Sequence, residues 1–227
     1  MKAYISELIG TFALVFAGTG AIIINDISGG VIAHIGIAFT FGLIVMAMIY
    51  SLGDISGAHI NPAVTLGFWV AGRLPNHKVL PYIISQFIGA LLASTILFFL
   101  FPQHSTLGVT LPSGSIFQTF ILEIILTFFL MFVIINVSTG AKEKGLMAGI
   151  AIGAIVALSA MFAGPISGAS MNPARSIGPA IVSGQIQELW IYILAPLIGA
   201  YLGIACCKCV QERGCCSRLQ EQIQEQN

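Results

Sequence analysis

Long, nearly uninterrupted apolar runs alternate with short polar segments along this chain of 227 residues. A helix needs about 20 mostly apolar residues to cross the roughly 30 Å hydrocarbon core of a bilayer. Six runs reach that length: about 4–24, 31–52, 79–101, 117–138, 145–164 and 189–207. Because these runs are continuously apolar, they disfavour a membrane β-barrel, whose strands alternate. The pattern predicts an all-α membrane protein with six transmembrane helices in a single membrane domain.

Two further apolar stretches, about 62–72 and 173–183, are too short to cross. Each opens with the same tripeptide, Asn61-Pro62-Ala63 in the first and Asn172-Pro173-Ala174 in the second. Asn is favoured at the helix N-cap and Pro at the first helical position, so each tripeptide predicts a helix start. Irregular backbone at membrane depth must line a cavity or pack against protein. We therefore expect two re-entrant half-helices.

The two halves of the chain repeat one another. ELIGTFALVF (7–16) matches EIILTFFLMF (123–132), and SGAHINPAVTLG (56–67) matches SGASMNPARSIG (167–178). The tripeptides GIA and IGA also recur at nearly the same offset. We assign 1–110 to a first repeat and 111–210 to a second. Each contains three spans, an odd number, so the second copy starts on the opposite side of the membrane. Such inverted repeats place the functional site near the midplane, where the interrupted helices meet.

Composition and charge agree with this class. Apolar residues make up 57% of the chain and charged residues 8%, whereas soluble domains carry about 25% charged residues. The net charge of zero offers no electrostatic footprint for nucleic acid. We also find no metal-ligand spacing, nucleotide-binding loop or nucleophile–base pair. The sequence thus predicts no enzymatic activity, no cofactor and no metal.

The cationic residues indicate the orientation. Eight of the nine Lys and Arg residues fall on one side if the chain crosses six times, which places both termini in the cytoplasm. The ninth, Arg175, falls on the other side, directly after the second Asn-Pro-Ala. A cationic residue that lies on the side opposite the other eight, and beside a re-entrant segment, is a candidate functional residue.

Glu7 and Glu123 occupy equivalent places in the first and fourth spans. Buried carboxylates in a membrane are costly unless they have partners. They fit either a proton relay or acceptors for backbone N–H groups of the re-entrant loops, and we favour the second role.

With its two Asn-Pro-Ala motifs in equivalent membrane-deep positions, the chain resembles the aquaporin or major intrinsic protein family over about residues 4–207. FAGPISGASMNPARSIGPA (162–180) is similar to the nodulin-like members. The resemblance implies an aquaporin-like fold, a homotetramer in the cell membrane, and a selectivity constriction formed by four residues. Counted from the motifs, these are Phe41, Ala160, Ala169 and Arg175.

Water-selective relatives usually have His where this chain has Ala160. The smaller side chain predicts a wider, partly apolar constriction that passes water, glycerol and other small neutral hydroxylated molecules, with boric or arsenous acid as further candidates. Ser176 and Ala180 instead resemble water channels, so a strict water channel is the alternative. An ion-coupled secondary transporter is the alternative from another class, since inverted repeats serve both. In the channel interpretation, Asn61 and Asn172 orient the permeating molecule, while Arg175 and the half-helix dipoles repel protons and other cations.

Five cysteines cluster at and after the last span: Cys206, Cys207, Cys209, Cys215 and Cys216. We expect a cytoplasmic position and reduced thiols, with acylation or soft-ion binding as alternatives. Residues 211–227 are expected to form a polar cytoplasmic tail.

Overall fold

The computed structural model describes residues 1–138 and 142–210, with the side chains of 142–145 excepted. The predicted tail, with Cys215 and Cys216, lies outside the described residues. The helices are α1 (Lys2–Ile27), α2 (Ala33–Ser56), α3 (Pro62–Val70), α4 (Asn76–Leu100), α5 (Ile116–Val137), α6 (Lys142–Ser167), α7 (Pro173–Ser183) and α8 (Leu189–Val210). Within the described ranges, six helices are long and apolar enough to cross a membrane, which confirms the six predicted spans. The remaining two, α3 and α7, are the predicted half-helices.

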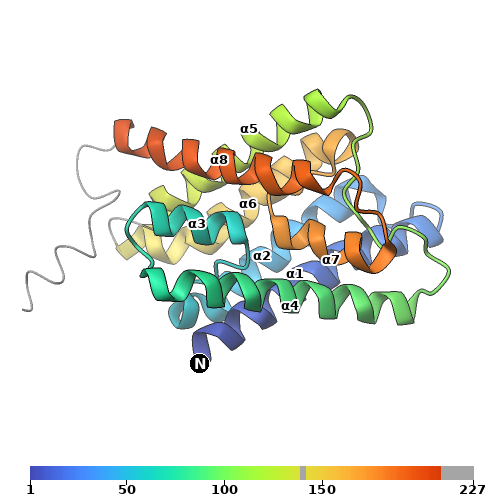
Figure 1. Ribbon diagram of the computed structural model, residues 1–227, viewed down its shortest axis with the longest axis horizontal. Coiled ribbons are helices and arrows are strands. Elements are labelled where there is room, and N and C mark those ends of the chain that lie inside the picture. Colours follow the sequence, from blue (N-terminus) through green and yellow to red (C-terminus); the bar gives the residue numbers. More distant parts are fainter. Residues whose placement is uncertain (139–141, 211–227) are drawn as a thin grey trace, which may run out of the picture.

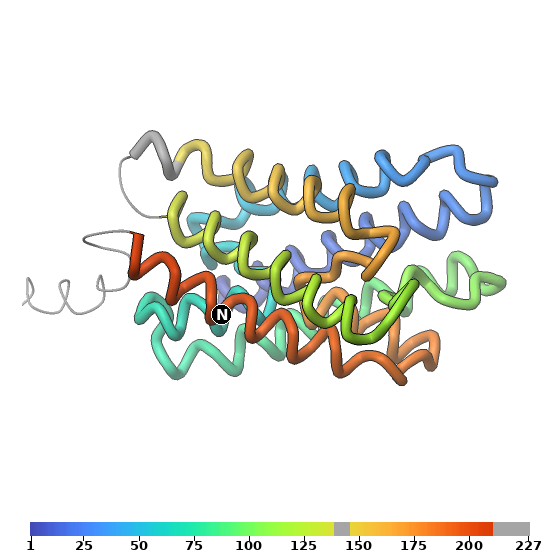
Figure 2. The backbone as a smooth tube through the Cα atoms, turned by 90° about the horizontal axis from the view of Figure 1, so that it is seen from above, coloured from blue at the N-terminus to red at the C-terminus, as the bar shows by residue number. Residues whose placement is uncertain are grey.

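The arrangement of the helices follows the internal repeat. The six long helices run side by side along the molecule, and α3 and α7 enter the bundle from opposite ends (Figures 1 and 2). In the first repeat α1 packs against α4, and in the second the equivalent helices α5 and α8 pack together. Extensive contact between α2 and α6 joins the two halves.

Glycines mark the places where these helices approach most closely. A Cβ atom on Gly89 of α4 would lie 2.3 Å from the Leu8 carbonyl oxygen of α1, and one on Gly199 of α8 would lie 2.3 Å from the Ile124 carbonyl oxygen of α5. Gly89 and Gly199 are the glycines of the repeated IGA tripeptide. Small residues let membrane helices pack backbone to backbone, so this repeated element is a helix contact in both halves.

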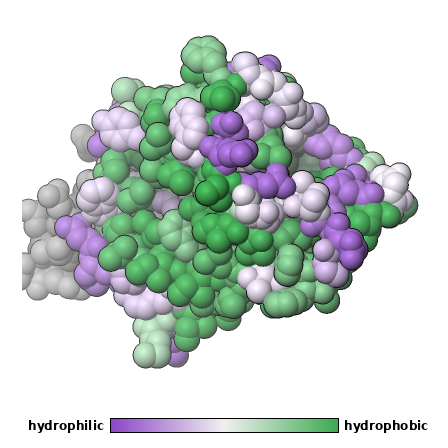
Figure 3. Space-filling model, turned by 45° about the vertical axis from the view of Figure 1, so that its right-hand side comes forward, coloured by the Kyte–Doolittle hydropathy of each residue, from purple (hydrophilic) through white to green (hydrophobic). Residues whose placement is uncertain are grey.

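The distribution of polarity is that of a membrane protein. Large apolar side chains such as Phe99, Phe117 and Phe162 are exposed on the outside of the bundle. Figure 3 shows a broad apolar surface, with polar residues gathered toward the ends of the molecule. Several polar and charged residues, Glu7 and Glu123 among them, are fully buried inside. Polar groups therefore line the interior of the bundle rather than its outer surface.

Candidate functional site

The two half-helices begin as the sequence predicts. Asn61 is the N-cap of α3, and its Oδ1 accepts the Ala63 N–H at 2.8 Å. Asn172 is the N-cap of α7, and its Oδ1 accepts the N–H groups of Ala174 and Arg175 at 3.0 and 3.3 Å. Both asparagines have extended backbone and precede a proline at the first helical position, the conformation expected of an N-cap.

The same asparagines join the two half-helices tip to tip. Asn61 Nδ2 donates to the Met171 carbonyl oxygen at 2.8 Å, and Asn172 Nδ2 donates to the Ile60 carbonyl oxygen at 2.9 Å. The pair of bonds is reciprocal, as a two-fold relation between the repeats requires. Because a side-chain amide has two N–H groups, each asparagine retains one N–H for another acceptor.

The loop before each half-helix is held in a strained conformation. Ala58 and Ile60 before α3 have φ values of 46° and 43°, and the equivalent Ala169 and Met171 before α7 have 42° and 52°. Non-glycine residues rarely adopt left-handed backbone, and such residues persist only where their surroundings hold them.

The buried glutamates supply those surroundings. Glu7 accepts the His59 N–H at 2.9 Å on Oε1, and the Ile60 N–H at 2.7 Å and Gln86 Nε2 at 2.8 Å on Oε2. Each of its oxygens is therefore bound by the loop before α3.

Glu123 repeats this arrangement in the second half. Its Oε1 accepts the Ser170 N–H at 2.9 Å and the Ser167 hydroxyl at 2.8 Å, while Oε2 accepts the Met171 N–H at 2.8 Å. Both carboxylates thus bind two successive backbone N–H groups of a re-entrant loop.

A cavity of about 820 Å³ passes the half-helix tips. Asn61 and Asn172 line it at the tips. Asp54, near the end of α2, and Lys78, near the start of α4, line it toward the end of the molecule where the N-terminus lies. Toward the opposite end it is lined by the four residues expected to form the constriction: Phe41, Ala160, Ala169 and Arg175.

Arg175 and Phe41 face each other in this part of the cavity. The Arg175 Cζ lies 5.0 Å from the centroid of the Phe41 ring, within the range of a cation–π contact. Arg175 is only 3% exposed, and its Nη1 donates to the Gly108 carbonyl oxygen at 2.8 Å. Among the described residues no carboxylate oxygen lies within 4.0 Å of an Arg175 nitrogen, so no described carboxylate neutralises Arg175 by contact.

The segment between α4 and α5 contributes residues that the sequence did not reveal. Besides the Gly108 carbonyl, the Thr110 hydroxyl donates to Ser176 Oγ at 2.7 Å, and Ser176 Oγ lies 2.6 Å from Ser170 Oγ. This chain of hydroxyls attaches the segment to both α7 and its preceding loop. No motif or periodicity marks Gly108 or Thr110, because they lie in an irregular segment.

The cysteine cluster departs from expectation at one position. Cys206 and Cys209 are free thiols, whereas Cys207 is disulfide-bonded. The expectation that every thiol in the cluster is reduced is therefore wrong for Cys207.

Six membrane-spanning helices, with two half-helices meeting tip to tip beside a cavity lined by both apolar and polar residues, define the chain as a membrane channel of the aquaporin fold. Comparison with known proteins gives the family: the model of the family "Major intrinsic protein" matches residues 1–206, and the chain belongs to this family. The predicted resemblance is thus confirmed.

Individual relatives agree with this assignment. The chain is 49% identical to aquaporin NIP1-1 of Zea mays over 204 residues, covering 89% of this chain and 72% of that protein. It is 44% identical to nodulin-26 of Glycine max, covering 89% of this chain and 75% of the relative. The X-ray structure of the aquaglyceroporin from Plasmodium falciparum superposes with a TM-score of 0.81 at 25% identity, covering 89% of this chain and 93% of the other.

Proposed function

We propose that this protein is a passive channel that conducts water and small uncharged hydroxylated solutes such as glycerol, and excludes protons and ions. Boric and arsenous acid belong to the same chemical class of neutral hydroxylated solutes. The observation that carries the proposal is the pair of reciprocally bonded asparagines, Asn61 and Asn172, lining the same cavity as Arg175.

The lining suits a solute with both hydroxyl groups and carbon atoms. The remaining N–H of each asparagine donates to a passing oxygen and so replaces a hydrogen bond to water. The apolar side chains of Phe41, Ala160 and Ala169 line the cavity together with Arg175. The carbon skeleton of a solute can leave water and contact these side chains without a free-energy penalty, because burying apolar surface is favourable.

Charge selectivity follows from the same geometry. Two helix N-termini, each equivalent to roughly half a positive charge, meet at the asparagine pair. Arg175 adds a full charge that no described carboxylate neutralises by contact. A cation meets repulsion from both sources in a low-dielectric setting, whereas a neutral solute does not.

We assign Glu7 and Glu123 a structural role in this channel. Their oxygens are occupied by backbone N–H groups of the re-entrant loops, which supports the acceptor interpretation over a proton relay. Flux should therefore need no ion gradient and no enzymatic step. By resemblance we place the channel in the cell membrane as a homotetramer, with both termini in the cytoplasm.

Substitution of Ala160 tests the solute class. Ala160→His adds an imidazole to the constriction and should lower glycerol permeability by roughly tenfold, equivalent to about 1.4 kcal/mol in the barrier, while water permeability changes much less. Ala160→Ser, which adds a hydroxyl with little volume, is the matched control and should retain glycerol flux. Stopped-flow light scattering of proteoliposomes measures both solutes.

Three results decide between the alternatives. Equal glycerol flux in the wild type and Ala160→His would refute the argument from size. Water flux without glycerol flux in the wild type would show a strict water channel. Glycerol flux that stops when proton and sodium gradients are collapsed would show a coupled transporter.

A further inference from the structure

The outer side of α8 carries two thiols that the proposed function does not use. Cys206 is half-buried and Cys209 is exposed, and both are free. Cys207 is buried in the core and disulfide-bonded. In the described part of the chain, no residue of α8 lines the cavity. The two free thiols therefore belong to the outer surface of the channel and not to its solute pathway.

Helical spacing places these thiols on the outer side of α8. Residues three or four apart lie on one side of a helix. Cys207 follows Gly203 by four residues, on the side where a Cβ at Gly203 would lie 2.9 Å from a backbone oxygen of α5. Cys206 follows the exposed Leu202 by four residues, and Cys209 follows Cys206 by three. Both free thiols thus continue the exposed side of the helix.

The first repeat indicates what this exposed side faces. The repeated IGA tripeptide aligns α4 with α8, so that Gly89 is equivalent to Gly199, 110 positions later. In this register the exposed sides of the two helices pair as Ile88 with Ile198, Leu92 with Leu202, Ile96 with Cys206, and Phe99 with Cys209. The exposed fractions of the first pair are 43% and 42%. Cys206 and Cys209 therefore occupy positions where the other repeat presents large apolar side chains to lipid.

Both thiols also lie near one boundary of the membrane. The 22 residues of α8 extend about 33 Å at 1.5 Å per residue, close to the thickness of the hydrocarbon core. Trp190 lies in the first turn of α8 and Lys208 in the last. Tryptophan is enriched at membrane interfaces, and lysine near a helix end extends toward the interface. Figure 1 shows the last turn of α8 at the same end of the molecule as the N-terminus, the end that we place in the cytoplasm.

We propose that Cys209, with Cys206 as a second acceptor, is a site of S-acylation by a long-chain fatty acyl group. The cysteine thiolate attacks the thioester carbonyl carbon of a fatty acyl coenzyme A. A carbon–sulfur bond to the cysteine forms and the bond to the coenzyme A sulfur breaks. The coenzyme A thiolate then takes up the proton that the cysteine released. The attached chain lies in the bilayer beside Leu202 on the exposed side of α8. The inference goes beyond the proposed function and uses only its placement of the termini in the cytoplasm.

The surroundings favour a fatty acyl group over a soft metal ion. Metal ions such as zinc are held by three or four protein ligands. In the described ranges, no three His, Cys, Asp or Glu side chains come close enough to hold a metal ion. A thioester is uncharged and its chain is apolar, so it suits a side of the helix that faces hydrocarbon. Cysteines at such juxtamembrane positions are typical acceptors of fatty acyl groups.

The test expresses the full chain in eukaryotic cells fed a palmitate analogue that carries an alkyne. Trypsin cuts after Lys208 and Arg213, so Cys209 is released in the peptide CVQER (209–213), separate from the later cysteines. Mass spectrometry should find this peptide acylated in the wild type. Hydroxylamine at neutral pH cleaves thioesters and should remove the acyl group, whereas it does not release a cysteine from a disulfide. Cys209→Ser should lose the label from this peptide, and adding Cys206→Ser should lower the total label further.

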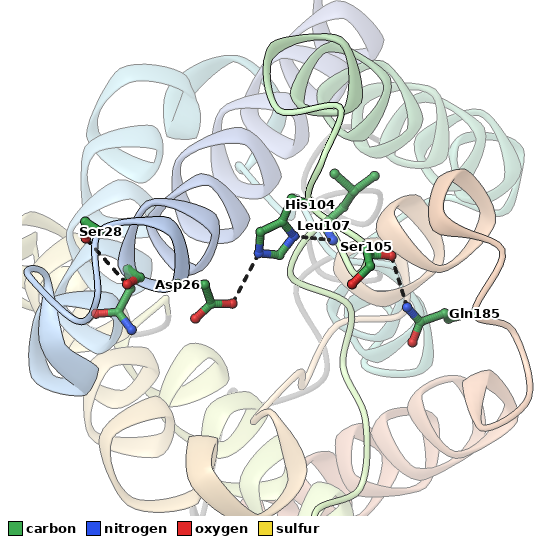
Figure 4. Close-up of polar contacts among 7 residues, drawn as sticks. Asp26, Ser28, His104, Ser105, Leu107 and Gln185 are labelled. Carbon is green, nitrogen blue, oxygen red and sulfur yellow. Dashed lines mark hydrogen bonds and ion pairs between the residues drawn. The ribbon is translucent and has the colours of Figure 1, made fainter.

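Ser28 provides the matched control at the other end of the channel. It directly follows the last residue of α1, is exposed, and donates its hydroxyl to the Asn25 carbonyl oxygen at 3.4 Å (Figure 4). Ser28→Cys therefore places a thiol at a helix end on the opposite side of the membrane. In the protein that lacks Cys206 and Cys209, this substitution should add no label, because fatty acyl coenzyme A is present in the cytoplasm. Label gained through Ser28→Cys would overturn the proposal.

The remaining outcomes separate this inference from the proposed function. An unmodified 209–213 peptide in the wild type, or one that carries a metal in place of the acyl group, would overturn the inference. Cys209→Ser should conduct water and glycerol as the wild type does, because no described residue of α8 lines the cavity. A wild type that conducts neither solute would refute the proposed function, and the state of the peptide would still decide the role of Cys209.

Discussion

The close fit between Gly18 of α1 and the Phe41 ring offers a direct test of the constriction. A Cβ atom on Gly18 would lie 2.1 Å from Phe41 Cε1 and 2.5 Å from Cζ. Ordinary carbon contacts begin near 3.4 Å, so Gly18→Ala requires the ring to withdraw by about 1.3 Å. Because α1 lies behind the ring, and the cavity and Arg175 lie before it, the ring moves into the pore.

The displaced ring would occupy part of the cavity that it lines. Overpacking a methyl group typically costs about 1–3 kcal/mol, which the ring avoids by turning toward the open cavity. We expect Gly18→Ala to lower glycerol permeability by roughly tenfold, about 1.4 kcal/mol in the barrier. Water permeability should fall less, because the narrower molecule passes a partly closed constriction more easily.

The assay is stopped-flow light scattering with glycerol and water gradients, and the chain supplies its own controls. A Cβ on Gly20, also in α1, would meet only Leu97 Cδ2 at 3.6 Å, so Gly20→Ala should match the wild type. Adding Phe41→Ala to Gly18→Ala removes the ring and should abolish the effect of the first substitution. Unchanged glycerol flux in correctly assembled Gly18→Ala protein would refute the assignment of Phe41 to the constriction.

Two further predictions concern the half-helix tips. Asn172→Asp replaces a donor with a negative charge between the two helix N-termini and should raise the proton leak of proteoliposomes at least about tenfold, because a nearby unit charge contributes several kcal/mol at an effective dielectric constant of about 20. The leak is measured with an internal pH-sensitive dye. An unchanged leak would contradict the role of this tip in excluding cations. Glu123→Leu leaves the Ser170 and Met171 N–H groups without their acceptor, at about 1–3 kcal/mol each, and should lower the melting temperature more than Glu123→Gln, which keeps one acceptor oxygen. Equal melting temperatures for the two variants would count against the proposed structural role.

The sequence alone determined the helices and their order. Apolar runs of sufficient length specify spans because lipid cannot satisfy an exposed backbone, and the Asn-Pro pairs at positions 61 and 172 specify helix starts through local capping. The duplicated segments implied inverted halves, and the family resemblance, confirmed by the comparisons, suggested Phe41 and Ala160 as pore residues. Each of these inferences depends on neighbours in the chain or on an internal match.

Only the tertiary structure decided what surrounds the pore. The roles of Gly18 and Gly108 depend on contacts with residues 23 and 67 positions away in the chain, and no periodicity encodes such distances. The Asn61–Met171 and Asn172–Ile60 bonds likewise exist only because the two loops meet across the two-fold relation. Local patterns fix which segments are helical, whereas the contacts that shape a constriction arise from how closely those helices and loops approach one another.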